Sequence, residues 1–356
     1  MTSVSKPAAP AVDLRNANLY RVAVVGAASL RGKEVVEILK DRNFPAIDVR
    51  LLDDDETLGQ LEAVGDEMSF IQSIRSEQFE RVDFTFFASD PRCTSNNWKR
   101  ARDLGSAIVD LSYALENEPG ASVRSPWIER LAGTPTPPEL QPGPVVVAHP
   151  AATVMALLAL RCTTAAKVER FVATVFEPAS ELGQKGMDEL HEQTVNLLSF
   201  QDLPKNVYDA QVAFNLIARY GQRSDFSLDT VSQRIRTHYR KIAPAAPLPP
   251  LTVLQAPIFH GHAFSIYLEL DKPVALEDLA QALAGDHVVV AHGPEDIPTS
   301  VSASGQRDIL VSLTAEAGRE NGVWLWVAAD NLRIAALNAV ECAETMTASR
   351  PRGQIQ

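Results

Sequence analysis

The chain has 356 residues, 46% of them hydrophobic and 22% charged, a balance typical of globular proteins and long enough for about two domains. The formal net charge is −12 and no lysine- and arginine-rich run opposes it, which argues against nucleic acid and membrane surfaces as partners. Three cysteines without a CxxC pair, no secretory signal and no run of membrane-spanning length indicate a cytoplasmic protein without a disulfide framework.

The first part of the chain alternates apolar strands with helical stretches. Residues 1–19 are rich in alanine, proline and serine and are expected to form a flexible tail. The pattern then predicts strands at residues 21–25, 49–52, 82–88, 107–111 and 145–147, with helical stretches between them. Strands spaced in this way pair in parallel, so residues 20–150 predict a Rossmann-type sheet domain.

The sharpest local signal is a strand that turns directly into a helix. Val145–Val147 are β-branched, Pro150 ends the strand, and residues 152–160 are apolar helix formers. Ligands gather outside the carboxyl ends of strands in open α/β sheets, so this turn is a candidate site. Its reactive side chains are those of His149 and Thr153.

The hydrophobic pattern of the second part of the chain differs from that of the first. Period-two alternation predicts strands at residues 168–176, 263–270, 309–313 and 323–327, and helical spacing predicts helices at 186–198 and 331–346. These elements predict an α+β domain over residues 151–330, with a mostly antiparallel sheet covered by helices on one face.

A glycine turn follows the first strand. Gly26 and Gly32 would let a pyrophosphate approach a helix N-terminus, although Ser29 replaces the middle glycine of a dinucleotide motif. Asp53, about 20 residues on, is placed to bind a ribose 2′-hydroxyl and would favour NAD over NADP. An ordinary βα turn at the glycines and a solvated acidic loop at Asp53–Asp55 are the alternative readings.

Two further candidates are reactive side chains outside these turns. His262 precedes a strand and could act as a general base or be a polar edge residue. His260 and His262 could bind a metal weakly, but no third ligand is placed by spacing, so no metal site is predicted. Cys93 is read as a loop residue after a strand, and a free loop cysteine is more often incidental than nucleophilic.

Together these segments resemble the aspartate-β-semialdehyde dehydrogenase family over nearly the whole chain, and residues 179–194 resemble its Usg branch. The similar segments are residues 24–27 with Gly32, 43–45, 108–114, 211–217, 261–262 and 330–340. The resemblance implies a Rossmann domain completed by helix 331–346, an α+β dimerisation domain and a homodimer. It also implies NADP-dependent, phosphate-using conversion between aspartyl phosphate and aspartate semialdehyde.

The resemblance assigns roles to several residues, and two of them concern the reacting centre. Ala152 stands at the position of the nucleophilic cysteine, where a methyl group cannot form the thioester of covalent catalysis. His262 matches the acid–base histidine. Asn331 lies in the closing motif of the family, which carries a cofactor contact. That motif is one residue shorter in this chain than in the family.

The remaining assigned positions concern anion binding. The arginine that binds the substrate carboxylate corresponds to Gln255, and the phosphate-binding arginine corresponds to Glu116, which reverses the charge. The substrate-contacting glutamate and lysine of the family correspond to positions near Ser232 and Arg234. These replacements predict the loss of the anionic substrate together with the nucleophile.

Three hypotheses follow from the sequence. The first is a dimeric binding or regulatory homologue that has lost the dehydrogenase reaction and binds NAD, NADP or no nucleotide. The second is an active NAD(P)-dependent oxidoreductase of altered chemistry, with His262 as base, Phe176 and Glu177 as pocket walls, and NAD against Asp53. The third is a heteromeric partner of an authentic dehydrogenase paralogue.

Overall fold

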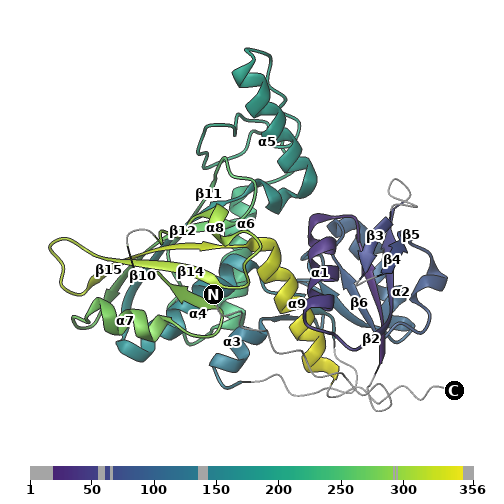
Figure 1. The fold of residues 1–356 in the computed structure, drawn as a ribbon, viewed down its shortest axis with the longest axis horizontal. Helices are drawn as coiled ribbons and strands as arrows, with labels where there is room; N and C mark the ends of the chain where they lie inside the picture. The colour runs from purple at the N-terminus through teal and green to yellow at the C-terminus, as the bar shows by residue number, and fades with distance from the viewer. Residues whose placement is uncertain are drawn as a thin grey trace, which may run out of the picture.

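A computed structural model describes residues 19–54, 61–64, 67–134, 143–291, 293 and 296–347 (Figure 1). For residues 61–64 and 67–69 the backbone alone is described. The expected flexible tail lies outside the described residues except for its last position, Leu19. Asp55, a member of the predicted acidic loop, also lies outside them.

The first sheet consists of seven strands in the order β5-β2-β1-β6-β7-β9-β8, and every paired neighbour in it is parallel. This confirms the predicted parallel, Rossmann-like sheet. The short edge strands β5 and β8 were not predicted, because Gln-Ser and Ser-Val-Arg form neither an apolar run nor an alternating pattern. The bounds are β1 Tyr20–Val25, β2 Ala46–Asp53, β5 Gln72–Ser73, β6 Phe84–Phe87, β7 Ala107–Asp110, β8 Ser122–Arg124 and β9 Val145–Val147, with a separate hairpin of β3 Leu61–Val64 and β4 Glu67–Phe70.

Helices cover this sheet, and one of them comes from the far end of the chain. The helices from the first part of the chain are α1 Leu30–Asp41, the 3-10 turn η1 Ser76–Phe79, α2 Pro91–Asp103 and α3 Pro126–Leu131. Helix α9 (Asn331–Thr347) packs against α1 and also contacts α3, α4, β7 and β9 (Figure 1). Most of its residues are buried because it lies between the two sheets rather than on the surface.

The second sheet is mixed, with six strands in the order β11-β10-β12-β15-β14-β13. Its three inner pairs are antiparallel, as expected, whereas the edge pairs β10–β11 and β13–β14 are parallel. The parallel pairs arise because helices lie between their strands in the chain and act as crossovers. The bounds are β10 Val168–Glu177, β11 Leu251–Gln255, β12 His262–Leu270, β13 Val288–Val290, β14 Ile309–Ala315 and β15 Gly322–Ala329.

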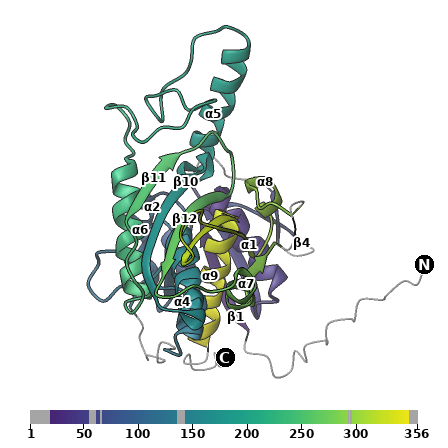
Figure 2. The same ribbon diagram turned by 90° about the vertical axis from the view of Figure 1, so that its left-hand side faces the viewer.

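Helices α4 (Pro150–Ala165), α6 (Leu228–Ile242) and α7 (Leu276–Leu283) pack against this sheet (Figure 2). Along β12 the residues alternate between buried and half-buried. Trp324 and Trp326 on β15 are 41% and 38% exposed, so the other face of the sheet is the more open one. The short helix α8 (Ser300–Ala303) contacts β15 as well.

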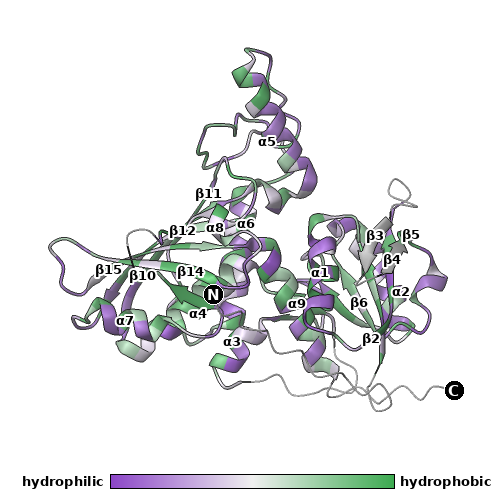
Figure 3. Ribbon diagram, viewed as in Figure 1, coloured by the Kyte–Doolittle hydropathy of each residue, from purple (hydrophilic) through white to green (hydrophobic). Residues whose placement is uncertain are grey.

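A helical arm projects from the second sheet (Figure 1). It begins at the 3-10 turn η2 (Ala179–Leu182) and continues through α5 (Gly183–Leu198), and hydrophobic and hydrophilic residues lie side by side along its ribbon (Figure 3). Leu198 and Phe200 at its end are 70% and 98% exposed. In the part of the chain that the structure describes, every helix is too short or too polar to cross a membrane.

Candidate active-site cluster at the junction of the two sheets

The predicted strand-to-helix turn is present between β9 and α4. His149 caps α4, because its Nδ1 accepts a hydrogen bond of 3.2 Å from the backbone N–H of Ala151. Pro150 is the first residue of the helix, a position where a missing N–H costs nothing. Ala152 lies in the first turn and is fully buried. The turn therefore presents a histidine and a methyl group.

His262 stands at the start of β12 in a fully buried position. Its Nε2 lies 3.0 Å from Oε2 of Glu177, the last residue of β10. The preceding Gly261 has a φ of +84°, which favours glycine, and its N–H donates to Asn331 Oδ1 at 3.0 Å. Among the described residues none hydrogen-bonds Nδ1 of His262. The ring is thus held on one side only.

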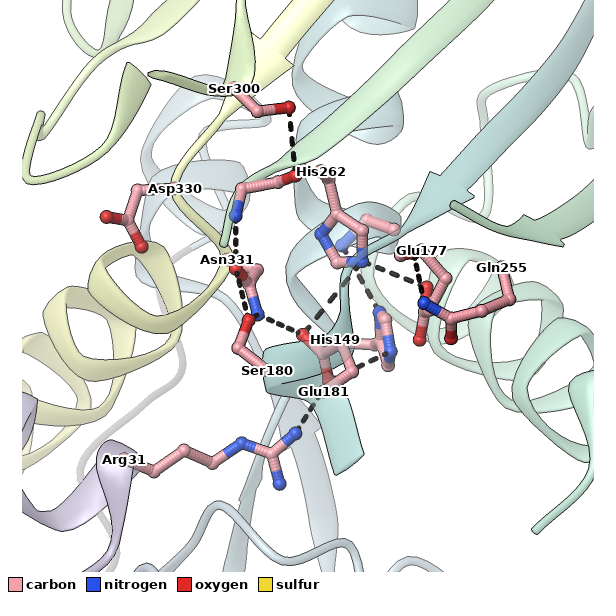
Figure 4. A network of polar contacts seen from close by, with 12 residues as sticks. Arg31, His149, Glu177, Ser180, Glu181, Gln255, His262, Ser300, Asp330 and Asn331 are labelled. Carbon is pink, nitrogen blue, oxygen red and sulfur yellow. Dashed lines mark hydrogen bonds and ion pairs between the residues drawn. The ribbon is translucent and has the colours of Figure 1, made fainter. Parts of the chain in front are cut away.

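Glu181 on η2 is the centre of a second set of contacts (Figure 4). Its Oε2 lies 2.7 Å from a guanidinium nitrogen of Arg31 on α1 and 4.0 Å from Nε2 of His149. Its Oε1 accepts a hydrogen bond of 2.8 Å from Asn331 and lies 3.9 Å from Nε2 of His262. Glu181 therefore joins residues of both sheets in one polar network.

The network shifts the pKa values of its members in opposite directions. Burial raises the pKa of Glu177. Burial opposes the charge of Glu181, but Arg31 and the nearby histidines outweigh it and lower its pKa to about 2. Burial also opposes protonation of His262, yet its contact with Glu177 outweighs burial and raises the pKa of His262. The Glu177–His262 pair therefore holds a proton between two buried groups.

The positions that resemble anion contacts form a separate ion pair. Glu116 Oε2 accepts hydrogen bonds from Arg234 Nε at 3.0 Å and from His238 Nε2 at 3.2 Å. Partial burial opposes its charge, but these two donors lower the pKa of Glu116 to about 2. Ser232 lies half-buried two residues before Arg234 on α6. Glu116 and Arg234 thus neutralise each other.

His238 and Gln255 are occupied by internal bonds. The N–H of His149 donates to His238 Nδ1 at 2.9 Å, which leaves the proton of His238 on Nε2, toward Glu116. Gln255 is fully buried, accepts a hydrogen bond of 2.7 Å from Tyr220 Oη and donates to the backbone oxygens of Glu177 and Ala256. Its amide fixes the end of β11 rather than facing open space.

Local packing and hydrogen bonds account for the residues of the glycine turn. A Cβ on Gly32 would lie 2.1 Å from the backbone oxygen of Gly26, so a side chain there cannot fit. Ser29 caps α1 by accepting from the N–H of Gly32 at 2.9 Å and donates to Ala88 O. Asp53 Oδ2 accepts from the Ala28 N–H at 2.7 Å, so its carboxylate stabilises the turn itself.

The structure corrects one prediction and adds residues that the sequence did not single out. Cys93 lies on helix α2, not on a loop, because Asp90 caps a helix that begins at Pro91. Glu181 and His238 had no assigned role, and Glu177 was expected only as a pocket wall. No sequence pattern singled them out, because the parallel register that brings Glu177 beside Gln255 is set only in the folded chain.

Comparison with known proteins supplies the family. A family model described as "Semialdehyde dehydrogenase, NAD binding domain" matches residues 21–155, and "Semialdehyde dehydrogenase, dimerisation domain" matches residues 157–334. The USG-1 protein homolog of Pseudomonas aeruginosa is 33% identical over 334 residues, which cover 91% of this chain and 97% of that protein. The aspartate-semialdehyde dehydrogenase of Rickettsia bellii is 27% identical over 336 residues, covering 92% and 97%.

A solved structure is also similar to this chain over most of its length. It is described as a probable aspartate-semialdehyde dehydrogenase from Pseudomonas aeruginosa, with a TM-score of 0.81 and 30% identity over 92% of this chain and 98% of that one. Its likeness agrees with the parallel first sheet and the mixed second sheet. Both domain models of the semialdehyde dehydrogenase family match, and together they cover most of the chain, so the chain belongs to this family.

Proposed function

We propose that this chain is a semialdehyde dehydrogenase homologue that does not catalyse the dehydrogenase reaction and acts as a dimeric binding or regulatory protein. The observation that carries the proposal is Ala152, a buried methyl group in the first turn of α4. A thioester requires a sulfur nucleophile at that point, and alanine offers no lone pair.

The surroundings of Ala152 support the same conclusion. Gln255 uses its amide for internal bonds, and Glu116 is paired with Arg234 and His238. Neither position therefore supplies the positive charge that would bind a carboxylate or a phosphate. A site of this kind would bind the anionic family substrate poorly even with a nucleophile present.

For the cofactor we propose NAD rather than NADP, if the chain binds either. The NAD binding domain of the family is present, and Gly26, Ser29, Gly32 and Asn331 remain the candidate contacts. Asp53 would accept a ribose hydroxyl and repel a 2′-phosphate. We assign residues 20–150 with helix 331–346 to this domain and residues 151–330 to the dimerisation domain.

For partners we propose a homodimer, and as a second possibility a heteromer with a catalytically active paralogue. The dimerisation domain of the family supports the homodimer. Light scattering of the purified chain measures its mass in solution. A stable monomer would contradict the homodimer, and unchanged activity of a co-expressed paralogue would contradict the regulatory heteromer.

The decisive test is turnover by the purified chain. Aspartate semialdehyde, inorganic phosphate and NADP or NAD are supplied, and reduced cofactor is followed by absorbance. We expect no turnover above the background without protein. Sustained turnover that requires phosphate would refute the proposal. Calorimetric titration with NAD and NADP, run separately, tests the nucleotide preference.

A second candidate function rests on the Glu177–His262 pair. A buried imidazole held by a carboxylate is an arrangement that can take up and release a proton. This favours an oxidoreductase of altered substrate, with His262 as acid–base group. Its test is cofactor reduction across a panel of aldehydes in the chain and in His262→Gln. Activity that His262→Gln abolishes would support it, and no activity on any aldehyde would count against it.

A further inference from the structure

A group of metal-ligand side chains lies at the junction of the two sheets, and the leading proposal, a homologue without dehydrogenase turnover, makes no use of it. His149, Glu177 and Glu181 place three ligand atoms within 4.8 Å of one another. His262 adds a fourth, with its Nε2 3.0 Å from Glu177 Oε2 and 3.9 Å from Glu181 Oε1. All four side chains are at most 5% exposed, and Figure 4 shows them converging.

The spacing of these atoms suits a small divalent ion. Zinc binds histidine nitrogen and carboxylate oxygen at about 2.0–2.2 Å, which places tetrahedral ligands about 3.3 Å apart. The separations of 3.0, 3.9 and 4.0 Å between histidine nitrogens and glutamate oxygens lie close to that value. Shifts of less than about 1 Å along these contacts would close the set around one ion.

The surroundings of His262 do not fix which of its ring nitrogens carries the proton. In the part of the chain that is described, nothing hydrogen-bonds Nδ1, although the ring is fully buried. The ring proton can therefore reside on Nδ1 when a metal ion replaces the hydrogen bond between Nε2 and Glu177 and binds the Nε2 lone pair.

His149 is the weaker of the two histidine ligands. Its Nδ1 already accepts from the Ala151 N–H at 3.2 Å, so its ring proton lies on Nε2. If His149 bound a metal ion through Nε2, its ring proton would move to Nδ1. The hydrogen bond from the Ala151 N–H to Nδ1 would then be lost. We therefore place His262, Glu177 and Glu181 as primary ligands and His149 as the fourth.

The charges around the group favour a divalent cation. An ion bound here would displace the proton held between Glu177 and His262. Glu177, Glu181 and the nearby Asp330 would then carry three formal negative charges, and Arg31 supplies one positive charge. Asp330 receives its hydrogen bonds from backbone N–H groups of Gly305 and Arg333, which do not neutralise it. Two negative charges remain, and one divalent ion would balance them.

We propose that His262, Glu177 and Glu181, completed by His149, bind one divalent transition-metal ion, with Zn²⁺ as the preferred ion. Imidazole ligands favour zinc and its neighbours over magnesium and calcium, which prefer oxygen alone. Asn331 and Arg31, which contact Glu181, would orient its carboxylate as outer partners. The site is independent of the leading proposal, the absence of dehydrogenase turnover, but it shares Glu177 and His262 with the second candidate function.

The experiment measures metal binding by the full-length chain. The chain is treated with a chelator, incubated for a long period with zinc chloride because the ligands are buried, and passed through a desalting column. Bound zinc is then counted by mass spectrometry of the metal. We expect one zinc per chain and a higher melting temperature with zinc. Co²⁺ is added in a parallel sample, where intense visible absorption reports tetrahedral coordination.

Variants locate the ion. Glu177→Gln keeps the shape of the side chain, and we expect it to weaken zinc binding at least about 100-fold, since even outer-partner changes cost 10–100-fold. His262→Gln is expected to do the same. His260→Ala, a half-buried histidine two residues away and outside the group, is the control and should bind zinc as the unaltered chain does.

Each outcome decides the proposal. No retained zinc in the unaltered chain would overturn it, and so would binding that survives both Glu177→Gln and His262→Gln. If neither variant folds by circular dichroism, the Co²⁺ spectrum of the unaltered chain decides. Tetrahedral-type absorption supports the site, and the pale spectrum of hydrated Co²⁺ contradicts it. Loss of the metal site would leave the proposed absence of dehydrogenase turnover unaffected.

Discussion

Arg31 and Glu181 form an ion pair of 2.7 Å that joins α1 of the first sheet to η2 beside the second. Their side chains are 18% and 5% exposed, so the pair is largely shielded from water. The Arg31 guanidinium also lies 5.2 Å from the ring centre of Tyr113. The pair therefore links the helix that follows β1 of the first sheet to the turn that follows β10 of the second.

This pair predicts a stability effect. Arg31→Met leaves Glu181 as a buried charge without its cation, and removing one partner of a buried pair costs about 3–5 kcal/mol. We expect a loss near the lower limit, because Arg31 is partly exposed. The double variant Arg31→Met with Glu181→Gln should recover part of the loss in urea unfolding. If the double variant loses as much stability as Arg31→Met alone, or as much as the two single variants added together, the two residues do not act as a pair.

Glu116 predicts a pH dependence. Its pKa is lowered to about 2 in the folded chain, so its stabilising contribution is complete above the ordinary value near 4.5 and is lost as pH falls toward 2. Glu116→Gln should therefore be less stable than the unaltered chain at pH 7, by about 1.5–3 kcal/mol. Unfolding measured from pH 7 to pH 2 should show the two curves converging. A constant difference across that range would contradict the assignment.

Ala152→Cys tests the proposal that this chain lacks the dehydrogenase reaction for more reasons than the residue at position 152. We expect no semialdehyde dehydrogenase activity in this variant, because Gln255 and Glu116 still supply no positive charge for an anionic substrate. The Ala152 site is fully buried, so the added sulfur should cost about 1–3 kcal/mol of stability. Thiol titration after unfolding confirms the new cysteine. Measurable phosphate-dependent turnover would show that the surrounding residues still bind the substrate.

Gly32 predicts a packing effect at the first βα turn. A Cβ there would lie 2.1 Å from Gly26 O, a backbone atom that cannot move aside cheaply. Gly32→Ala should lower stability by more than about 2 kcal/mol. Gly293→Ala is the matched control, since nothing lies within 4 Å of its Cβ position, and it should stay within about 0.5 kcal/mol. Equal thermal stability of both variants would refute the packing explanation.

Much of the fold could be predicted because its signals are local. Apolar runs and period-two alternation gave the strands, and Pro150 with the helix formers after it gave the start of α4. His262 was located at the start of a strand for the same reason. The parallel edge pairs of the second sheet escaped prediction, since pairing direction depends on crossovers rather than on periodicity.

The site required the tertiary structure. Arg31 meets Glu181 across 150 residues of chain, and Arg234 meets Glu116 across 118. By itself the sequence determined the strand-to-helix turn, the methyl group of Ala152 and the position of His262, because each depends on neighbouring residues. Only the folded chain decided that Glu177 holds His262 and that Glu116 is neutralised. Those contacts depend on which strand ends and helices pack together, and no local pattern encodes that.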